Sequence, residues 1–279
     1  MRFSPIVIGA LYPGITRELS ADILTCQALS AKPYAICTSH VVAGRGVVTD
    51  VLNVPADTVS AQLEHVFETE RPTAAKVGIV GSTPTIEQIF DHLASLEGPV
   101  IYNLTLSGPS GEDVLGQQGL EAITNHLNVP DLVTTRLTDA SLVAGMEIPS
   151  LDDAQVAAQR IAQQGASRVL IRCGRLPTHF FDTESEPPDF AADLYFDGED
   201  FAVFEAPFLS NLDSLHGASS GLLLPLLRHL QSGSDLEPAL QKSKGRVANA
   251  LHAAQQERPE EQHSTFFDAL REEPTVSEA

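Results

Sequence analysis

Basic residues are scarce in this sequence, and that scarcity excludes two classes of partner. The chain of 279 residues has 17 lysines and arginines against 37 aspartates and glutamates, which gives a formal net charge of −20. Affinity for nucleic acids comes mostly from Lys and Arg side chains that release counterions from the phosphate backbone. A chain this acidic is therefore not expected to bind nucleic acid or an anionic membrane surface.

Cysteines and long apolar runs are scarce as well. The three cysteines, Cys26, Cys37 and Cys173, are widely spaced and form no C-x-x-C pair, which argues against a zinc or redox site and favours buried thiols. No stretch approaches the roughly 20 apolar residues that cross a bilayer. The apolar run at residues 5–8 is too short for a signal peptide. We therefore expect a cytoplasmic protein.

The sequence does contain an alternation of short apolar segments with longer segments of helical period. This alternation is typical of an α/β fold, in which crossover helices connect the strands of a parallel sheet. The length allows one large domain or two small ones. The predicted strands are residues 5–9, 34–41, 74–80, 99–104, 132–134 and 168–173.

Apolar spacing predicts amphipathic helices between these strands. The two clearest stripes are Val59, Leu63, Val66 and Phe67 in one segment and Ile86, Ile89, Phe90 and Leu93 in another. Ser150 and Asp153 form a capping-box pattern at the start of a further helix, and Gly165 ends that helix.

The pattern changes at residue 191. Two segments with a period of two, residues 191–196 and 202–206, predict an antiparallel pair at the sheet edge, joined by a turn at 197–200. The polar, turn-rich segment 178–189 before this pair either covers a site or is a plain surface loop.

Two predicted helices, at residues 217–231 and 236–256, complete the expected domain, which spans residues 1–256. Residues 257–279 form a charged, acidic tail. The pair Phe266-Phe267 is the part of this tail that could dock back onto the domain.

The segment 215–221, Leu-His-Gly-Ala-Ser-Ser-Gly, carries the clearest chemical signal. It is a turn of small residues that opens an apolar helix, so several backbone N–H groups stay free at the positive end of the helix dipole. Such a helix start binds phosphate readily. The alternative is that the small residues only let the helix pack closely on the sheet, with Ser219 or Ser220 as its N-cap.

Five short segments, taken in their order along the chain, carry a resemblance to a known family. They are Ser-Ala-Asp-Ile-Leu-Thr at 20–25, Lys-Val-Gly-Ile-Val at 76–80, Ser-Gly-Glu at 110–112, Asp-Leu-Tyr-Phe-Asp-Gly at 193–198, and His216-Gly217. Over about residues 5–251, the sequence resembles the hydroxymethylpyrimidine and phosphomethylpyrimidine kinases of the ribokinase-like superfamily. The resemblance implies a central, mostly parallel sheet flanked by helices on both faces, with a small edge β-lid. It also implies ATP and magnesium as cofactors, a small-molecule substrate and a homodimer.

The resemblance assigns the helix start near residue 217 to the transferred phosphate. The backbone N–H groups of Gly217, Ala218 and Ser219 would form the anion hole, and Ser220 stands at the position of the catalytic base, which is Cys in this branch of the superfamily. The backbone N–H donors do not depend on which side chains stand at these positions. A serine hydroxyl, however, is a poor proton acceptor unless another base activates it.

The substrate pocket that the resemblance implies includes Tyr12, Val42 and Ile79. Tyr12 stands where the family has an Asp, in a loop at 10–18 that has lost most of the family's glycines, so the backbone cannot approach a ligand as closely. Val42 replaces a Gln that reads the pyrimidine edge. Because Val42 offers no hydrogen bond, much of the discrimination that such a pairing provides is lost.

On the nucleotide side the resemblance points to Asn103, Arg136 and Arg172, and Arg172 keeps a cation where the family has Lys. Arg136 either neutralises phosphate charge or excludes the metal. Asp139 is the acidic residue left to assist Mg²⁺, which prefers carboxylate and phosphate oxygens. Together with Arg175, which stands where the family has His, these arginines would supply the positive charge that an acidic protein needs in order to hold ATP.

Two functions follow from these residues. The first is ATP-dependent phosphoryl transfer to a hydroxymethylpyrimidine-type small molecule in thiamine biosynthesis, with weak or altered activity, in which His216 or Asp213 either substitutes for the base or only orders the loop. The alternative is a catalytically inactive family member that acts as a small-molecule-binding or regulatory partner. An altered substrate is a further possibility, since Tyr12 and Val42 make the pocket more apolar.

Overall fold

The computed structural model describes residues 2–44, 47–106, 116–175, 190–212 and 215–271. Three features singled out in the sequence lie outside these ranges: the Ser-Gly-Glu segment at 110–112, the polar segment 178–189, and Asp213.

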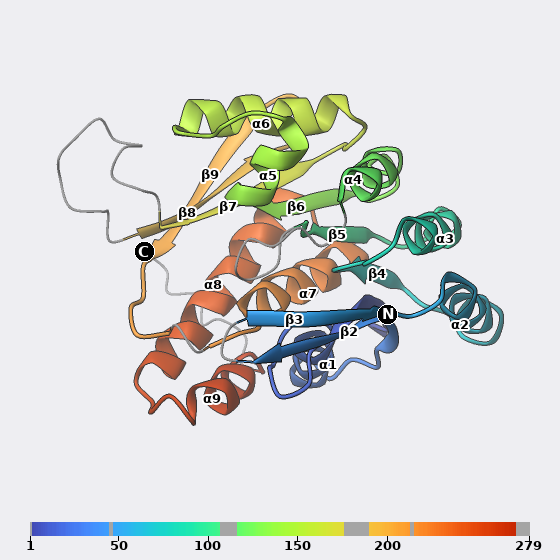
Figure 1. The fold of residues 1–279 in the computed structure, drawn as a ribbon. Helices are drawn as coiled ribbons and strands as arrows, with labels where there is room; N and C mark the ends of the chain where they lie inside the picture. Colours follow the sequence, from blue (N-terminus) through green and yellow to red (C-terminus); the bar gives the residue numbers. More distant parts are fainter. Residues whose placement is uncertain (1, 45–46, 107–115, 176–189, 213–214, 272–279) are drawn as a thin grey trace.

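The described strands form one sheet in the order β3-β2-β1-β4-β5-β6-β7-β8-β9 (Figure 1). In this order the strands from β2 to β7 run parallel, while β3, β8 and β9 pair antiparallel at the two ends. The strands are β1 (Pro5–Leu11), β2 (Tyr34–Gly44), β3 (Val47–Asn53), β4 (Ala74–Val77), β5 (Val100–Leu104), β6 (Leu132–Arg136), β7 (Val169–Arg175), β8 (Phe190–Phe196) and β9 (Phe201–Pro207).

All six strands predicted from the sequence are confirmed, and the hairpin predicted at the sheet edge is the pair β8–β9. The sequence does not predict β3, which pairs with an extended β2 at the opposite edge. A bulge between Val42 and Ala43 shifts the register of this pair. Because a bulge interrupts the alternation of side chains, a search for a period of two does not find the strand.

Helices cover both faces of the sheet (Figure 1). One face carries α2 to α6, and the other carries α1, α7 and α8, with α9 beside α8. The helices are α1 (Leu19–Ala28), α2 (Ala56–Thr69), α3 (Thr83–Leu93), α4 (Gly116–Thr124), α5 (Leu137–Ala144), α6 (Leu151–Gln163), α7 (Ala218–Gln231), α8 (Leu236–Gln255) and α9 (Gln262–Ala269). Within the described ranges, no helix combines the length and apolarity needed to cross a membrane.

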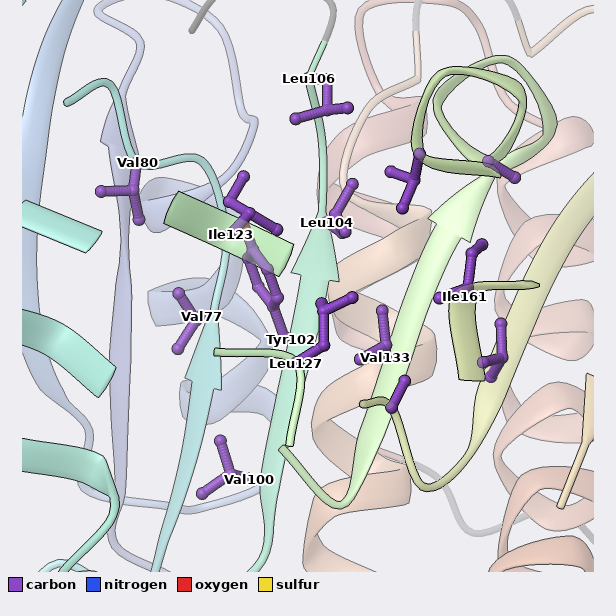
Figure 2. Close-up of a cluster of buried hydrophobic side chains, with 14 of the residues drawn as sticks. Val77, Val80, Val100, Tyr102, Leu104, Leu106, Ile123, Leu127, Val133 and Ile161 are labelled. Carbon is purple, nitrogen blue, oxygen red and sulfur yellow. The ribbon is translucent and has the colours of Figure 1, made fainter. Parts of the chain in front are cut away.

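The central strands send alternate side chains into the two helix layers. Val100, Tyr102 and Leu104 of β5 belong to the core cluster under α2 to α6 (Figure 2), whereas Ile101 belongs to the cluster under α1, α7 and α8. A strand buried on both faces reads as a nearly continuous apolar run. Since burial of each such side chain contributes about 1.5–3 kcal/mol, the carboxyl end of β5 is firmly anchored.

Helix α6 begins and ends where its capping pattern predicts. The Ser150 hydroxyl accepts a hydrogen bond from Asp153 N at 3.0 Å and also contacts the Asp153 carboxylate. The helix ends at Gln163, two residues before Gly165, whose φ of 124° suits only glycine. The capping box therefore fixes the helix that precedes β7.

Helix α9 lies in the segment 257–279 that the sequence assigns to an acidic tail. Its side chains Phe266 and Phe267 are buried in a cluster with Ala254 of α8 and with Leu270. Arg246 of α8 donates from Nη1 to the Leu270 carbonyl oxygen at 2.7 Å. Residues 262–270 are thus packed against the rest of the fold.

Candidate functional site

A cavity of about 280 Å³ lies at the carboxyl ends of the central strands. The chain runs outward from β1 to β2 and β3, and returns to β4 on the other side of β1. The gap between β1 and β4 is therefore a topological switch point. Ligands of open α/β sheets bind in the crevice outside the strand ends at such a point.

Residues 215–220 form one wall of the cavity, at the start of α7. Gly217 is the N-cap of this helix with φ 102°, and Gly221 N makes a helical hydrogen bond to Gly217 O at 2.9 Å. The N–H groups of Ala218, Ser219 and Ser220 precede that bond, so helix geometry leaves them available to an anion. The structure thus brings the four predicted phosphate-loop residues together.

Gly217 leaves no room for a side chain. A Cβ atom at this position would lie 2.8 Å from Cζ of Phe267 and 3.3 Å from Cβ of Ala21. Its positive φ also disfavours any other residue. Helices α1 and α9 therefore hold the loop in place from behind.

Arg172 joins this loop to the strand ends. Its Nη2 donates to Asn103 Oδ1 at 2.8 Å, and its Nη1 contacts the Ser219 hydroxyl. Both partners are neutral, and the Nε of Arg172 has no hydrogen-bond partner among the described residues. Burial lowers the pKa of Arg172. A partly buried cation whose hydrogen-bond partners are neutral, beside a helix N-terminus, is an arrangement that an anion would stabilise.

Arg136 lines the cavity, and Asp139 holds it there. The Asp139 carboxylate is fully buried, accepts from Arg136 Nη2 at 2.8 Å, and accepts from Leu106 N at 3.3 Å. Asp139 itself does not line the cavity. Arg175, the third arginine of the sequence analysis, lies elsewhere, with its guanidinium carbon 4.6 Å from the Phe208 ring centroid.

Two of the three predicted pocket side chains reach the cavity. Tyr12 and Ile79 line it and pack together with Val41 in one apolar cluster. Val42, by contrast, is 50% exposed and does not line the cavity. Successive side chains of a strand point to opposite faces, so Val41 faces the cluster and Val42 faces away from it. The predicted pocket residue Val42 therefore lies away from the cavity, and Val41 packs behind the cavity wall with Tyr12 and Ile79.

Arg17 and Glu18 also line the cavity, and no motif in the sequence marks either of them. Glu18 precedes α1 with φ 48° and ψ −121°, and its Oε2 accepts a hydrogen bond from Ile79 N at 3.1 Å. The signal in the sequence is a Glu at the end of the loop 10–18, where the resembling family has Gly. The strained backbone itself is visible only in the structure.

A buried ion pair lies beneath the site. Lys76 Nζ is 2.8 Å from Asp22 Oδ2, and both side chains are almost completely buried. Burial raises the pKa of Asp22, and the Lys76 ammonium and the adjacent Ser220 hydroxyl offset that effect only in part. The other oxygen of Asp22, Oδ1, has no hydrogen-bond partner among the described residues. Ser220 is close enough to Asp22 to affect its pKa, but no hydrogen bond joins the two side chains within the described ranges.

His216 also lines the cavity. Its backbone N–H donates to His263 Nε2 of α9 at 3.0 Å. Burial, followed by the charges of Arg17 and His263, lowers the pKa of His216 to about 4. The imidazole is therefore neutral at pH 7.

Comparison with known protein families gives a match over most of the chain. The model of a family described as phosphomethylpyrimidine kinase matches residues 18–265. The hydroxymethylpyrimidine/phosphomethylpyrimidine kinase of Aquifex aeolicus is 27% identical over 236 residues, covering 83% of this chain and 87% of that protein. The enzyme of the same name from Rhizobium meliloti is 28% identical over 239 residues, which is 85% of either chain.

Solved structures share the fold. The pyridoxal kinase of Staphylococcus aureus in complex with AMP-PCP superposes with a TM-score of 0.77 at 23% identity, covering 91% of this chain and 89% of that one. The phosphomethylpyrimidine kinase of Clostridium difficile gives a TM-score of 0.72 at 20% identity, covering 89% and 99%. The ribokinase-like architecture expected from the sequence is thereby confirmed.

Proposed function

The chain belongs to the phosphomethylpyrimidine kinase family, and from this premise we propose that it transfers the terminal phosphoryl group of ATP to a hydroxymethyl-aminopyrimidine or its phosphate in thiamine biosynthesis. In this reaction the bond between the γ-phosphorus and the bridging oxygen of ATP breaks, ADP leaves, and a bond forms to the substrate oxygen. When the acceptor is the alcohol, its proton passes to the protein.

The observation that carries this proposal is the charge distribution around the cavity. In a protein with a net charge of −20, the described cavity wall holds Arg17, Arg136 and Arg172 beside the N-terminus of α7. Phosphoryl transfer depends mainly on positioning and on electrostatic stabilisation of the phosphoryl oxygens. The pocket meets both needs, because Asn103 and Ser219 hold Arg172 and Asp139 holds Arg136.

Ser220 is the proposed first acceptor of the substrate proton. Its hydroxyl lies beside Asp22, a carboxylate whose pKa is raised by burial and which is therefore a stronger base than an exposed aspartate. In this scheme Ser220 takes the proton of the substrate hydroxyl while passing its own proton to Asp22. The scheme gives a serine the second base that it needs in order to act in this position.

The arginine-lined wall suits ATP, whereas magnesium would be bound mainly through the phosphates of the nucleotide. Among the described residues, no three His, Cys, Asp or Glu side chains gather into a metal site. The Asp139 carboxylate is engaged by Arg136 and by Leu106 N. Proteins commonly hold Mg²⁺ through nucleotide phosphates and water with one or two carboxylates. Asp139, which is fully buried and does not line the cavity, does not fit the metal in this arrangement, so its sequence-based assignment to Mg²⁺ is not carried further. Magnesium that arrives with the nucleotide would supply charge neutralisation of the phosphates.

A coupled ADP-release assay with hydroxymethylpyrimidine and with its phosphate tests the function. We expect ATP-dependent turnover of at least one of them, and a loss of about 10²- to 10⁴-fold in kcat for Ser220→Ala, the usual contribution of a positioned general base. Ser210→Ala, which removes an exposed hydroxyl away from the cavity, is the matched control.

Two outcomes would reject this function. Binding of Mg-ATP without turnover of either pyrimidine would favour the inactive, small-molecule-binding family member. Failure of Mg-ATP to raise the melting temperature would reject any kinase, because a ligand at about 100 times its Kd stabilises a protein by about 2.7 kcal/mol.

A homodimer and a cytoplasmic location are part of the same proposal. Light scattering coupled to size exclusion should give about twice the chain mass of 29.9 kDa. A mass of one chain at micromolar concentration would contradict the dimer.

A further inference from the structure

Glu18 holds a backbone conformation that few residues other than glycine adopt. Its φ of 48° and ψ of −121° come at the last residue before α1, at the end of the loop 10–18. Strained residues of this kind persist only where the surroundings impose them, and they cluster at ligand sites. The conformation aims the side chain of Glu18 at the gap between β1 and β4.

Two glycines make room for the Glu18 carboxylate. A Cβ atom on Gly78 would lie 2.1 Å from Glu18 Oε2, and one on Gly9 would lie 3.4 Å from the same oxygen. Gly9 belongs to β1, and Gly78 follows β4 directly. The carboxylate therefore sits at the topological switch point itself, where Ile79 N donates to it at 3.1 Å.

Glu18 also differs in charge from the other residues that line the cavity. It is the one acidic side chain among the described residues that line the cavity. No Lys, Arg or His nitrogen of the described chain lies within 4.0 Å of its carboxylate, so Glu18 is not the partner of an ion pair there. A carboxylate accepts about four hydrogen bonds, and Ile79 N accounts for one. The cavity wall thus combines cations, among them Arg172 beside the start of α7, with a hydrogen-bond acceptor at Glu18.

The part of the cavity wall beside Glu18 is apolar and could pack against a flat ring. Tyr12 and Ile79, which line the cavity beside Glu18, belong to the same apolar cluster. Val42, which replaces the pyrimidine-reading Gln of the resembling family, faces away from the cavity. Among the described residues that line the cavity, Asn103 is therefore the one with a side-chain amide, and its Oδ1 already accepts a hydrogen bond from Arg172.

We propose that Glu18 determines substrate specificity by pairing with the amino edge of the heterocycle. An exocyclic amine next to a protonated ring nitrogen presents two parallel N–H donors, which match the two oxygens of a carboxylate in a charge-assisted pair. The hydroxymethyl group of such a ring would then point toward Ser220 and Arg172. This inference rests on the proposed function, and it assigns recognition of the amino edge of the ring to Glu18. A ring with an oxo group at that edge would turn lone pairs toward Glu18 and be rejected.

Isothermal titration of the protein with hydroxymethylpyrimidine and with the same ring lacking the amino group tests the inference. The wild type is expected to bind the amino compound about 10- to 100-fold more tightly, the range expected for hydrogen bonds to a charged group. Glu18→Gln should lose most of that preference while keeping affinity for Mg-ATP. Glu199→Gln, an exposed glutamate in the turn between β8 and β9, should keep the preference.

The outcomes separate this inference from the proposed function. An equal preference in wild type and Glu18→Gln would overturn the specificity role, since a purely structural Glu18 would change affinity for both rings alike. Failure of the wild type to bind either ring would overturn it as well. Glu18-dependent binding without any phosphoryl transfer would leave the inference standing and reject the kinase activity.

Discussion

Arg172 reaches across β6 to donate to Asn103 Oδ1 at 2.8 Å, so that one guanidinium links the carboxyl ends of β7 and β5. The same guanidinium contacts Ser219 in the first turn of α7. This cation is therefore held in place between the sheet and the phosphate loop before any nucleotide arrives. Preorganised charge of this kind avoids the cost of reorganisation during phosphoryl transfer.

Replacement of Arg172 should weaken nucleotide binding. We expect Arg172→Ala to raise the KM for ATP by about 10- to 100-fold, because it removes hydrogen bonds to a charged ligand, and Arg172→Lys to recover only part of the loss, because a Lys lacks the planar fork. Steady-state kinetics with varied ATP would measure both. Arg175→Ala, which removes the cation next to Phe208, should leave the KM for ATP unchanged. Equal effects of the alanine changes at 172 and 175 would contradict the assignment.

The ion pair beneath the site should dominate local stability. Lys76→Met leaves the Asp22 carboxylate buried without its partner 2.8 Å away, and breaking a buried pair in this manner typically costs about 3–5 kcal/mol of unfolding free energy. Urea unfolding would measure the loss. Lys32→Met is the control, since the Lys32–Glu70 pair is exposed, with side chains 51% and 41% accessible, and exposed pairs contribute little to stability. A loss of less than about 1 kcal/mol for Lys76→Met would show that Asp22 is readily neutralised.

His216 should make stability depend on pH between about 6.5 and 4. Its pKa falls from 6.5 to about 4 on folding, chiefly through burial. In that interval the unfolded chain binds more protons than the folded chain, so the free energy of unfolding decreases as the pH falls. His216→Gln should flatten this slope in urea unfolding at pH 7 and pH 5, whereas His252→Gln, on the exposed side of α8, should not. His263, whose pKa is also lowered by burial, would maintain part of the slope in the single variant.

The sequence predicts the sheet well because its strands are buried on both faces and produce apolar runs that no amphipathic helix resembles. β3 is missed for the opposite reason. It lies at an edge, its pairing with β2 contains a bulge, and Val42 and Leu52 are exposed at 50% and 59%. Neither a continuous apolar run nor a clean alternation survives under those conditions.

The candidate site is predictable where backbone geometry follows from residue type and unpredictable where it does not. The small residues at 217–220 predict a helix start, and in the structure they line the cavity. The direction of the Val42 side chain depends on which face of the strand is buried, and the sequence does not fix that face at a bulged edge pair. The place of Glu18 in the cavity wall is not evident from the sequence, because it depends on a positive φ and on the space that Gly9 and Gly78 leave for the carboxylate.

The contact between Phe267 and Gly217 affects how the protein can be truncated. The family match ends at residue 265, in the middle of α9 and just before the two phenylalanines. A gene truncated at the end of the family match would encode a protein without Phe267, whose ring packs against the turn at Gly217. An inactive fragment of this kind would reflect the trimming and not the chemistry of the intact chain.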